Sequence, residues 1–202
     1  MQLREKKKQD RRDRIYRSAM ELFGTHGYEA TTIEQIAEKA YLAVGTVYNY
    51  FSSKGDLLLS LLVDRWKEGI GAGEQVSKRG KKDLLHAVEF LTARYIGSFS
   101  TYPKRVWREF VSVAMSKQPG LMEDLWQMDR TFIDELTETL GDFQERGDLS
   151  ADVSIEDLAQ TIYSVLITNV LRYLTADPMS LEALKKSMGA QVKIICKGIT
   201  RP

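Results

Sequence analysis

The side chains best suited to chemistry lie in a short segment between residues 31 and 57. Hydroxyl and amine groups that can donate hydrogen bonds to phosphate oxygens recur there, at Thr32, Tyr48, Tyr50 and Lys54. Lys54 stands at the predicted start of a helix, where backbone N–H groups also favour a bound anion. These residue types indicate binding to a phosphate backbone rather than catalysis.

Other residues of the same segment suit contact with the edges of bases. Gly45, near the start of a short predicted helix, has no side chain to hold the backbone away from a groove. Thr46 can reach a phosphate or a thymine methyl group, and Asn49 can form two hydrogen bonds with an adenine edge. The segment therefore favours a helix that approaches a nucleic acid closely.

Two short helices joined by a tight turn would position these groups. Thr31 followed by Glu34 forms a capping-box pattern at the start of the first helix. The apolar residues of that helix recur at i, i+3, i+4 and i+7 and form one stripe: Ile33, Ile36, Ala37 and Ala40. Residues 44–50 are predicted as the second helix, and a longer helix before both carries one apolar face, with Ile15, Ala19, Leu22 and Phe23. This layout is typical of a helix-turn-helix.

The stretch TTIEQIAEKAYLAVGTVYNYFSSKGDL, residues 31–57, resembles the DNA-binding segment of the tetracycline-repressor (TetR) family. The shared features are spread over the whole stretch: Thr31, Thr32, Ile36, Ala37, Ala40, Gly45, Thr46, Tyr48, Tyr50, Phe51, Ser53, Lys54 and Leu57. The resemblance implies that one group of residues faces the major groove, namely Val44, Gly45, Thr46 and Asn49. It implies that a second group holds the DNA backbone, namely Thr32, Tyr48, Tyr50 and Lys54. Val47 and Phe51 are expected in the core, and simple packing is the alternative for Tyr48 or Tyr50.

The sequence departs from the family's pattern in the turn of the motif. Tyr41 stands where the family usually has glycine, and Ala43 stands where it has a serine or a similar N-cap. A tyrosine forced to positive φ is strained, and alanine caps a helix poorly. We therefore expect a turn that is less rigid than usual, although neither departure removes a contact group.

The first 17 residues carry eight basic and three acidic side chains, a net charge of +5. The basic residues are Arg4, Lys6, Lys7, Lys8, Arg11, Arg12, Arg14 and Arg17. Such a run is usually a solvated helix start or a disordered tail. Because this one directly precedes the helix-turn-helix, the alternative is an arm that reaches a neighbouring DNA backbone or minor groove.

The whole chain is predicted to fold as an all-α protein of about nine helices. It has 202 residues, of which 43% are hydrophobic, with four prolines and no strand-like alternation. No apolar run reaches the roughly 20 residues of a membrane span, and the single Cys196 cannot form an internal disulfide, so a cytoplasmic location is expected. The predicted domains are a helix-turn-helix domain over residues 1–52 and an effector-binding and dimerisation domain over residues 53–202. Residues 53–73 form the connecting helix.

Aromatic and methionine residues of the second domain suit an adaptable apolar pocket, and the family binds its effectors in this region. The candidates are Tyr95, Phe99, Trp107, Phe110, Met115, Trp126 and Phe132, with Asn169 as a polar anchor. Plain core packing is the alternative for each of them. We expect an apolar or aromatic effector, and an anionic or acyl-type effector would follow if Arg94 or Arg172 faced the pocket.

The segment 155–174 is apolar on nearly every side, so it must be covered on all sides. A partner subunit is a natural cover in a chain of this size, and the family dimerises through its last two helices as a four-helix bundle. The predicted interface residues are Leu158, Ile162, Val165, Leu166, Val170, Leu184, Met188, Val192 and Ile195. The alternative is a helix that is central to the core of one chain.

These features predict a homodimeric regulator that binds a palindromic DNA operator and releases it when a small-molecule effector binds, with no cofactor, metal or membrane partner. By resemblance, the effector would move the connecting helix and so misplace the two DNA-binding heads. An enzyme is disfavoured because the sequence lacks a Gly-rich phosphate loop, a nucleophile elbow, an HExxH motif and a His/Cys cluster. The alternative from another class is an all-helical small-molecule-binding or adaptor protein that has lost specific DNA binding.

Overall fold

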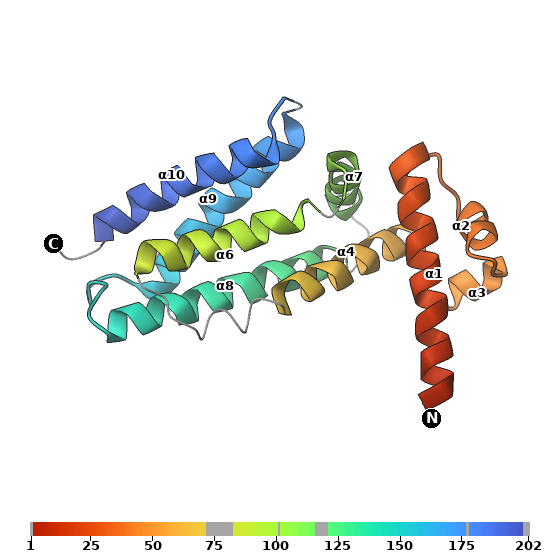
Figure 1. Ribbon diagram of the computed structural model, residues 1–202, viewed down its shortest axis with the longest axis horizontal. Coiled ribbons are helices and arrows are strands. Elements are labelled where there is room, and N and C mark those ends of the chain that lie inside the picture. The colour runs from red at the N-terminus through yellow and green to blue at the C-terminus, as the bar shows by residue number, and fades with distance from the viewer. Residues whose placement is uncertain (1, 72–82, 101, 116–120, 177, 200–202) are drawn as a thin grey trace. The chain divides into compact units, whose positions relative to one another are not determined.

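The computed structural model describes residues 2–71, 83–100, 102–115, 121–176 and 178–199 (Figure 1). These ranges hold nine helices and no strand, which confirms the all-α prediction. The helices are α1 (Gln2–His26), α2 (Ile33–Lys39), α3 (Val44–Tyr48), α4 (Lys54–Gly71), α6 (Leu84–Ser98), α7 (Lys104–Met115), α8 (Leu121–Glu145), α9 (Ile155–Thr175) and α10 (Leu181–Ile199). The Arg79-Gly80 and Pro119-Gly120 pairs of the sequence predict two further helix breaks, and both lie outside the described residues.

The chain divides into two compact units. The first comprises residues 1–65 and 102–122, so it holds α1, α2, α3, most of α4 and α7. The second comprises residues 66–101 and 123–202, which includes α6, most of α8, α9 and α10. The unit with the N-terminal helices thus extends beyond residue 52. None of the helices in the described ranges is both long and apolar enough to cross a membrane.

One apolar core lies beneath the N-terminal helices of the first unit. Phe23 of α1, Ile36 of α2 and Val47 of α3 are each at most 1% exposed, and Phe51 after α3 is 3% exposed. The positions predicted as core for Val47 and Phe51 are therefore confirmed. Full burial of a side chain of this size contributes about 1.5–3 kcal/mol, so these contacts are what hold α3 against α1 and α2.

The start of α2 is capped one residue later than the sequence pattern suggested. The Thr32 hydroxyl accepts a hydrogen bond from the Gln35 N–H at 3.2 Å, and the Gln35 side chain accepts one from the Thr32 N–H at 2.9 Å. Thr31 is fully buried instead, and its hydroxyl donates to the Gly27 carbonyl at 2.7 Å. The predicted Thr31–Glu34 box is wrong because Thr31 closes the loop that follows α1.

The turn between α2 and α3 forms a Schellman motif around Tyr41. The Tyr41 N–H donates to the Glu38 carbonyl at 3.0 Å, and the Leu42 N–H donates to the Ala37 carbonyl at 2.9 Å. This geometry places Tyr41 at φ 56°, the left-handed region that favours glycine. Ala43 makes no side-chain cap to α3. The positive φ of Tyr41 and the poor cap at Ala43 are thus confirmed.

In the second unit, α10 packs against both α6 and α9 (Figure 1). The apolar residues of α9 and α10 that the sequence assigned to a subunit interface are mostly inside this packing. Seven of them are at most 7% exposed in the single chain: Leu158, Ile162, Leu166, Val170, Leu184, Met188 and Val192. Their assignment to a subunit interface is corrected, because they form the core of one chain. Only Val165 and Ile195 are partly exposed.

Candidate nucleic-acid interface

The residues predicted to contact base edges lie on the solvent side of α3. Asn49 is exposed and Thr46 is partly exposed, while Val47 on the opposite side of the helix is buried. A Cβ added at Gly45 would meet no atom within 4 Å. Packing within the described chain therefore does not require a glycine at this position.

The two predicted backbone contacts from tyrosine differ in their surroundings. Tyr48 is 51% exposed, so its hydroxyl is presented to solvent. Tyr50 is partly buried, and its hydroxyl donates to the Lys8 carbonyl of α1 at 3.4 Å. The Tyr50 ring lies 6.2 Å from the ring of Phe51. Tyr50 thus combines the predicted surface position with the packing role that was its alternative.

Thr32 is exposed at the start of α2, as expected for a backbone contact, but its oxygen is engaged in the capping box. Glu34 lies beside it, and the pKa of this carboxyl group is lowered by its own backbone N–H and by the Thr32 hydroxyl.

Lys54 does not hold its ammonium group out to solvent as predicted. The Nζ atom donates to the carbonyl oxygens of Tyr28 at 2.7 Å, Thr31 at 3.0 Å and Glu29 at 3.3 Å. It also lies 4.2 Å from the centre of the Tyr28 ring. These bonds use all three ammonium hydrogens, so Lys54 closes the loop between α1 and α2 and is not available to a phosphate. The sequence carried no signal for this role, because the three carbonyl groups meet only in the folded loop.

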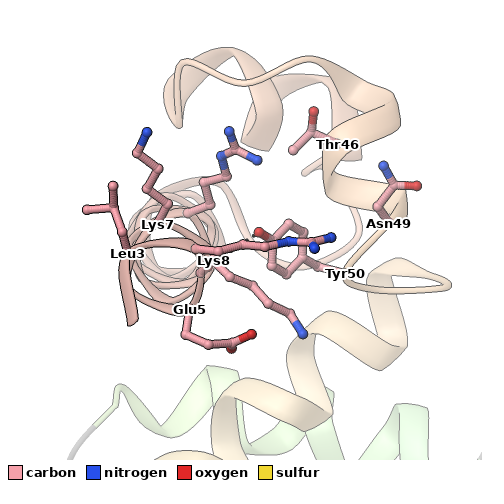
Figure 2. Close-up of a pocket in the computed structure, with 9 residues that line it drawn as sticks. Leu3, Glu5, Lys7, Lys8, Thr46, Asn49 and Tyr50 are labelled. Atoms are coloured by element: carbon pink, nitrogen blue, oxygen red, sulfur yellow. Dashed lines mark hydrogen bonds between the residues drawn. The ribbon is translucent and has the colours of Figure 1, made fainter. Parts of the chain in front are cut away.

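A groove lies between the N-terminal turns of α1 and the segment that carries α3 (Figure 2). It encloses about 890 Å³ and is lined by Leu3, Arg4, Glu5, Lys7, Lys8 and Arg11 of α1 and by Thr46, Asn49 and Tyr50. Four of these residues are cationic and one is anionic, so the groove is strongly positive. The basic run forms the first turns of α1, which is helical from Gln2 onwards, so it is not a disordered tail.

Hydrogen bonds and an ion pair among three side chains join α1 to α4. The Tyr16 hydroxyl donates to the Asp64 carboxylate at 2.8 Å, and the Arg12 guanidinium bonds the same carboxylate at 2.7 Å. Arg12 also donates to the Tyr16 oxygen at 2.8 Å and 3.0 Å. Burial, followed by the bond to Asp64, raises the pKa of Tyr16, so the phenol stays protonated. This cluster fixes the basic helix one turn beyond the groove.

The predicted pocket residues are divided between the two units. In the second unit, the Tyr95 ring lies 4.9 Å from the Phe132 ring and 6.0 Å from the Phe99 ring. In the first unit, Trp107 and Phe110 of α7 pack edge to face at 6.1 Å. Met115 and Trp126 are 71% and 54% exposed. Met115 and Trp126 therefore do not fit an enclosed pocket, because their side chains are exposed to solvent.

Asn169 is buried, but it serves the packing of two helices. Its amide donates to the Gln191 side chain of α10 at 2.6 Å, and its carbonyl accepts from the Ser187 hydroxyl at 2.9 Å. These bonds tie α9 to α10. The prediction of Asn169 as a pocket anchor is therefore replaced by a structural role.

Asp129, which the sequence did not single out, is a buried polar group beside the aromatic cluster. It is 4% exposed and accepts a hydrogen bond from the Tyr95 hydroxyl at 2.8 Å. Burial raises its pKa, while hydrogen bonds from Tyr163 and Tyr95 act in the opposite direction. Arg94, considered above as an anchor for an anion, is neutralised by a bidentate ion pair with Glu135.

Comparison with known proteins agrees with this geometry. The model of the family described as "Bacterial regulatory proteins, tetR family" matches residues 15–61. The HTH-type transcriptional regulator HbdR of Aromatoleum sp. is 39% identical over 83 residues, which are 41% of this chain and 34% of HbdR. The HTH-type transcriptional repressor KstR of Rhodococcus jostii is 28% identical over 173 residues, covering 82% of this chain and 74% of KstR.

The likeness extends to the helical body. The crystal structure of the transcriptional regulator FadR of Bacillus subtilis with stearoyl-CoA has a TM-score of 0.74 at 20% identity, covering 92% of this chain and 98% of FadR. At this identity the likeness shows the fold alone. Because the residues that the family model matches are those that build and support α2 and α3, the chain is a transcriptional regulator that belongs to the tetR family of bacterial regulatory proteins.

Proposed function

We propose that this regulator is a ligand-relieved repressor that binds a palindromic operator as a homodimer. Residues 1–52 carry the DNA contacts, and residues 53–202 carry dimerisation and the effector site. The observation that supports DNA binding most directly is the exposed face of α3, on which Thr46 and Asn49 lie beside a strongly positive groove. Base edges specify a site and phosphates position the protein on it, and this surface offers groups for both.

The proposed base contacts come from Thr46 and Asn49, with Val44 and Gly45 allowing close approach in the major groove. Tyr48 contributes a hydroxyl group to the backbone at the edge of that groove. Lys54 acts indirectly, because it holds the loop before α2 in place. The good bidentate contact that Asn49 can make with adenine corresponds to about 1–3 kcal/mol of discrimination.

The experiment is operator binding measured by footprinting and fluorescence anisotropy on DNA flanking the gene. Asn49→Ala and Thr46→Val should lower affinity for the protected site about 5- to 100-fold, as expected for lost base contacts, and leave binding to random duplex nearly unchanged. Thr25→Val is the matched control, because Thr25 is an exposed residue of α1 outside the groove. If the Asn49→Ala and Thr46→Val variants bound the protected site as tightly as the wild-type protein, the proposal would be contradicted.

For the dimer we propose the exposed face of α9 and α10 in place of the buried residues predicted from the sequence. Gln160, Ser164 and Thr168 recur every four residues on α9, and Gln191 lies beside them on α10 at a groove of about 410 Å³. Leu171 and Ile194 add apolar surface, being 45% and 72% exposed. Small hydroxyl side chains allow helices to approach closely, so this face suits a four-helix bundle with a second copy.

For the effector we propose an apolar ligand beside the cluster of Tyr95, Phe99 and Phe132. The bidentate pair with Glu135 leaves Arg94 without a net charge to offer to an anion, which favours an acyl chain over a small anion. Stearoyl-CoA, the ligand of FadR of Bacillus subtilis, is the first probe. Stearoyl-CoA should release the operator, whereas free coenzyme A at the same concentration should not. Release by neither compound would contradict an acyl effector of this length.

A further inference from the structure

Apart from Lys6, the basic residues between positions 4 and 17 of α1 fall into two sets with different surroundings. Arg12 bonds Asp64, Arg14 pairs with Asp10 at 3.3 Å, and Arg17 donates to the Asp13 carbonyl at 3.3 Å. The second set, which we call the groove cations, is exposed and has no ion-pair partner within the described ranges: Arg4, Lys7, Lys8 and Arg11. The fold therefore uses one set of cations internally and leaves the other to solvent.

The groove cations form one stripe on a rigid helix. Their positions follow the spacing i, i+3, i+4 and i+7, so they share one face of α1. With a rise of about 1.5 Å per residue, the stripe from Arg4 to Arg11 spans about 10 Å along the helix axis. Figure 2 shows Lys7 and Lys8 projecting from α1 in different directions, with the segment that carries Thr46, Asn49 and Tyr50 to one side of the helix.

The groove also has a fixed opposite wall. Tyr50 joins the two sides, because its hydroxyl donates to the Lys8 carbonyl and its ring borders the buried Phe51. The cluster of Arg12, Tyr16 and Asp64 holds α1 on the next turn. A DNA strand in the groove would thus have the cations of α1 on one side and the polar face of α3 on the other.

We propose that this groove holds one sugar-phosphate strand of double-stranded DNA, with the groove cations gripping phosphates that lie outside the base pairs contacted by α3. This inference rests on the proposed operator binding and adds a second, sequence-independent contact to it. The polyanionic backbone is the ligand class that fits, because the lining carries four cations and only one carboxylate. The contact lengthens the site on each half of the operator.

Lys6 provides a matched control within the same turn of α1. It has the same charge and exposure as Lys7 and Lys8, but it does not line the groove. We would compare Lys6→Gln, Lys7→Gln and Lys8→Gln on the operator and on random duplex, over a range of salt concentrations. Circular dichroism of each variant checks that α1 stays helical.

Lys7→Gln and Lys8→Gln should each lower affinity for both DNAs about 3- to 10-fold and reduce the slope of log K against log salt by about 0.9, the value for one lost phosphate contact. Lys6→Gln should change neither quantity. In hydroxyl-radical footprints, the two groove variants should lose protection at the flanks and keep it where α3 binds.

Equal slopes for all three variants would overturn the groove contact, even if the wild-type protein still selected its operator. Conversely, a wild-type protein that bound operator and random duplex equally would contradict the proposed function. In that case a slope reduced only by the Lys7 and Lys8 variants would still support the groove. The two failures are therefore distinguishable.

Discussion

At the scale of single residues, Lys54 and Tyr41 show how the same motif can be read correctly at one position and wrongly at another. The positive φ angle of Tyr41 could be predicted from the sequence, because it is determined by the local turn that follows α2. Lys54 was predicted to bind phosphate, yet its ammonium group is used by three carbonyl groups of a preceding loop. No local pattern reports a contact between residues that are more than 20 positions apart.

Replacing Lys54 by methionine should destabilise the protein. Lys54→Met keeps most of the apolar stem but leaves the carbonyl groups of Tyr28 and Thr31 without their charged donor, which costs about 1.5–3 kcal/mol. Urea unfolding followed by circular dichroism measures this loss. If Lys54→Met kept full stability and weakened only DNA binding, the ammonium group would be a phosphate contact after all.

Replacing Tyr41 by glycine should stabilise the protein. The side chain is 88% exposed, so its removal costs little packing, and glycine adopts positive φ without the roughly 1–2 kcal/mol penalty of an L-residue. We expect a gain of about 1 kcal/mol, reduced by the greater freedom of glycine in the unfolded chain. Tyr41→Ala is the control in urea unfolding, because alanine keeps the strain. A gain of equal size for alanine would assign the effect to the exposed ring.

At the scale of helices, local periodicity predicted the helix-turn-helix well and failed on α9. Ile36 and Val47 are both buried as predicted, because each of the two short helices packs one face against its neighbours. In α9 the apolar residues were numerous enough to suggest a helix that is covered on all sides. The structure buries one face against the rest of its unit and exposes Gln160, Ser164 and Thr168, which a count of apolar residues overlooks.

Asp129 ties the stability of the helical body to pH. Its pKa in the folded protein is raised by burial above the ordinary value of 3.8, so the folded state holds the proton more tightly than the unfolded chain. The contribution of this group to stability is therefore full below pH 3.8 and is lost as pH rises through the raised pKa.

Asp129→Asn should remove that pH dependence. Asparagine stays neutral and can still accept a hydrogen bond from Tyr95, so the variant should gain stability relative to the wild type as pH rises from 4 to 8. Melting temperatures across this range measure the difference, with Asp134→Asn on the exposed side of α8 as the control. A difference that did not grow with pH would mean that Asp129 is compensated in the folded state.

At the scale of the whole molecule, the all-α class and the family could be predicted from the sequence, whereas the dimer face could not. Composition, proline placement and one continuous motif of 27 residues are enough to predict the all-α class and the family. A subunit interface depends on which apolar residues remain outside after the chain has packed on itself. Leu166 and Met188 were candidates by their type, and only the fold shows that they are used inside one chain.

A charge in the proposed dimer face should separate the subunits. Thr168→Arg places a guanidinium group among Gln160, Ser164 and Gln191, where a second copy would bury it. Light scattering should then show a monomer, and affinity for the palindromic operator should fall at least 10-fold because one head binds alone. Thr131→Arg on the exposed side of α8 is the control. A Thr168→Arg protein that stayed dimeric would exclude this face.

The anchoring of α1 by Arg12, Tyr16 and Asp64 has a thermodynamic consequence. A disordered basic tail loses conformational entropy when it binds, and its ordering produces a large negative change in heat capacity. Here the helix is already formed, so association with DNA through the groove should occur without new helicity. Calorimetry should report a nearly temperature-independent enthalpy for this contact, with an affinity set mainly by the release of counterions.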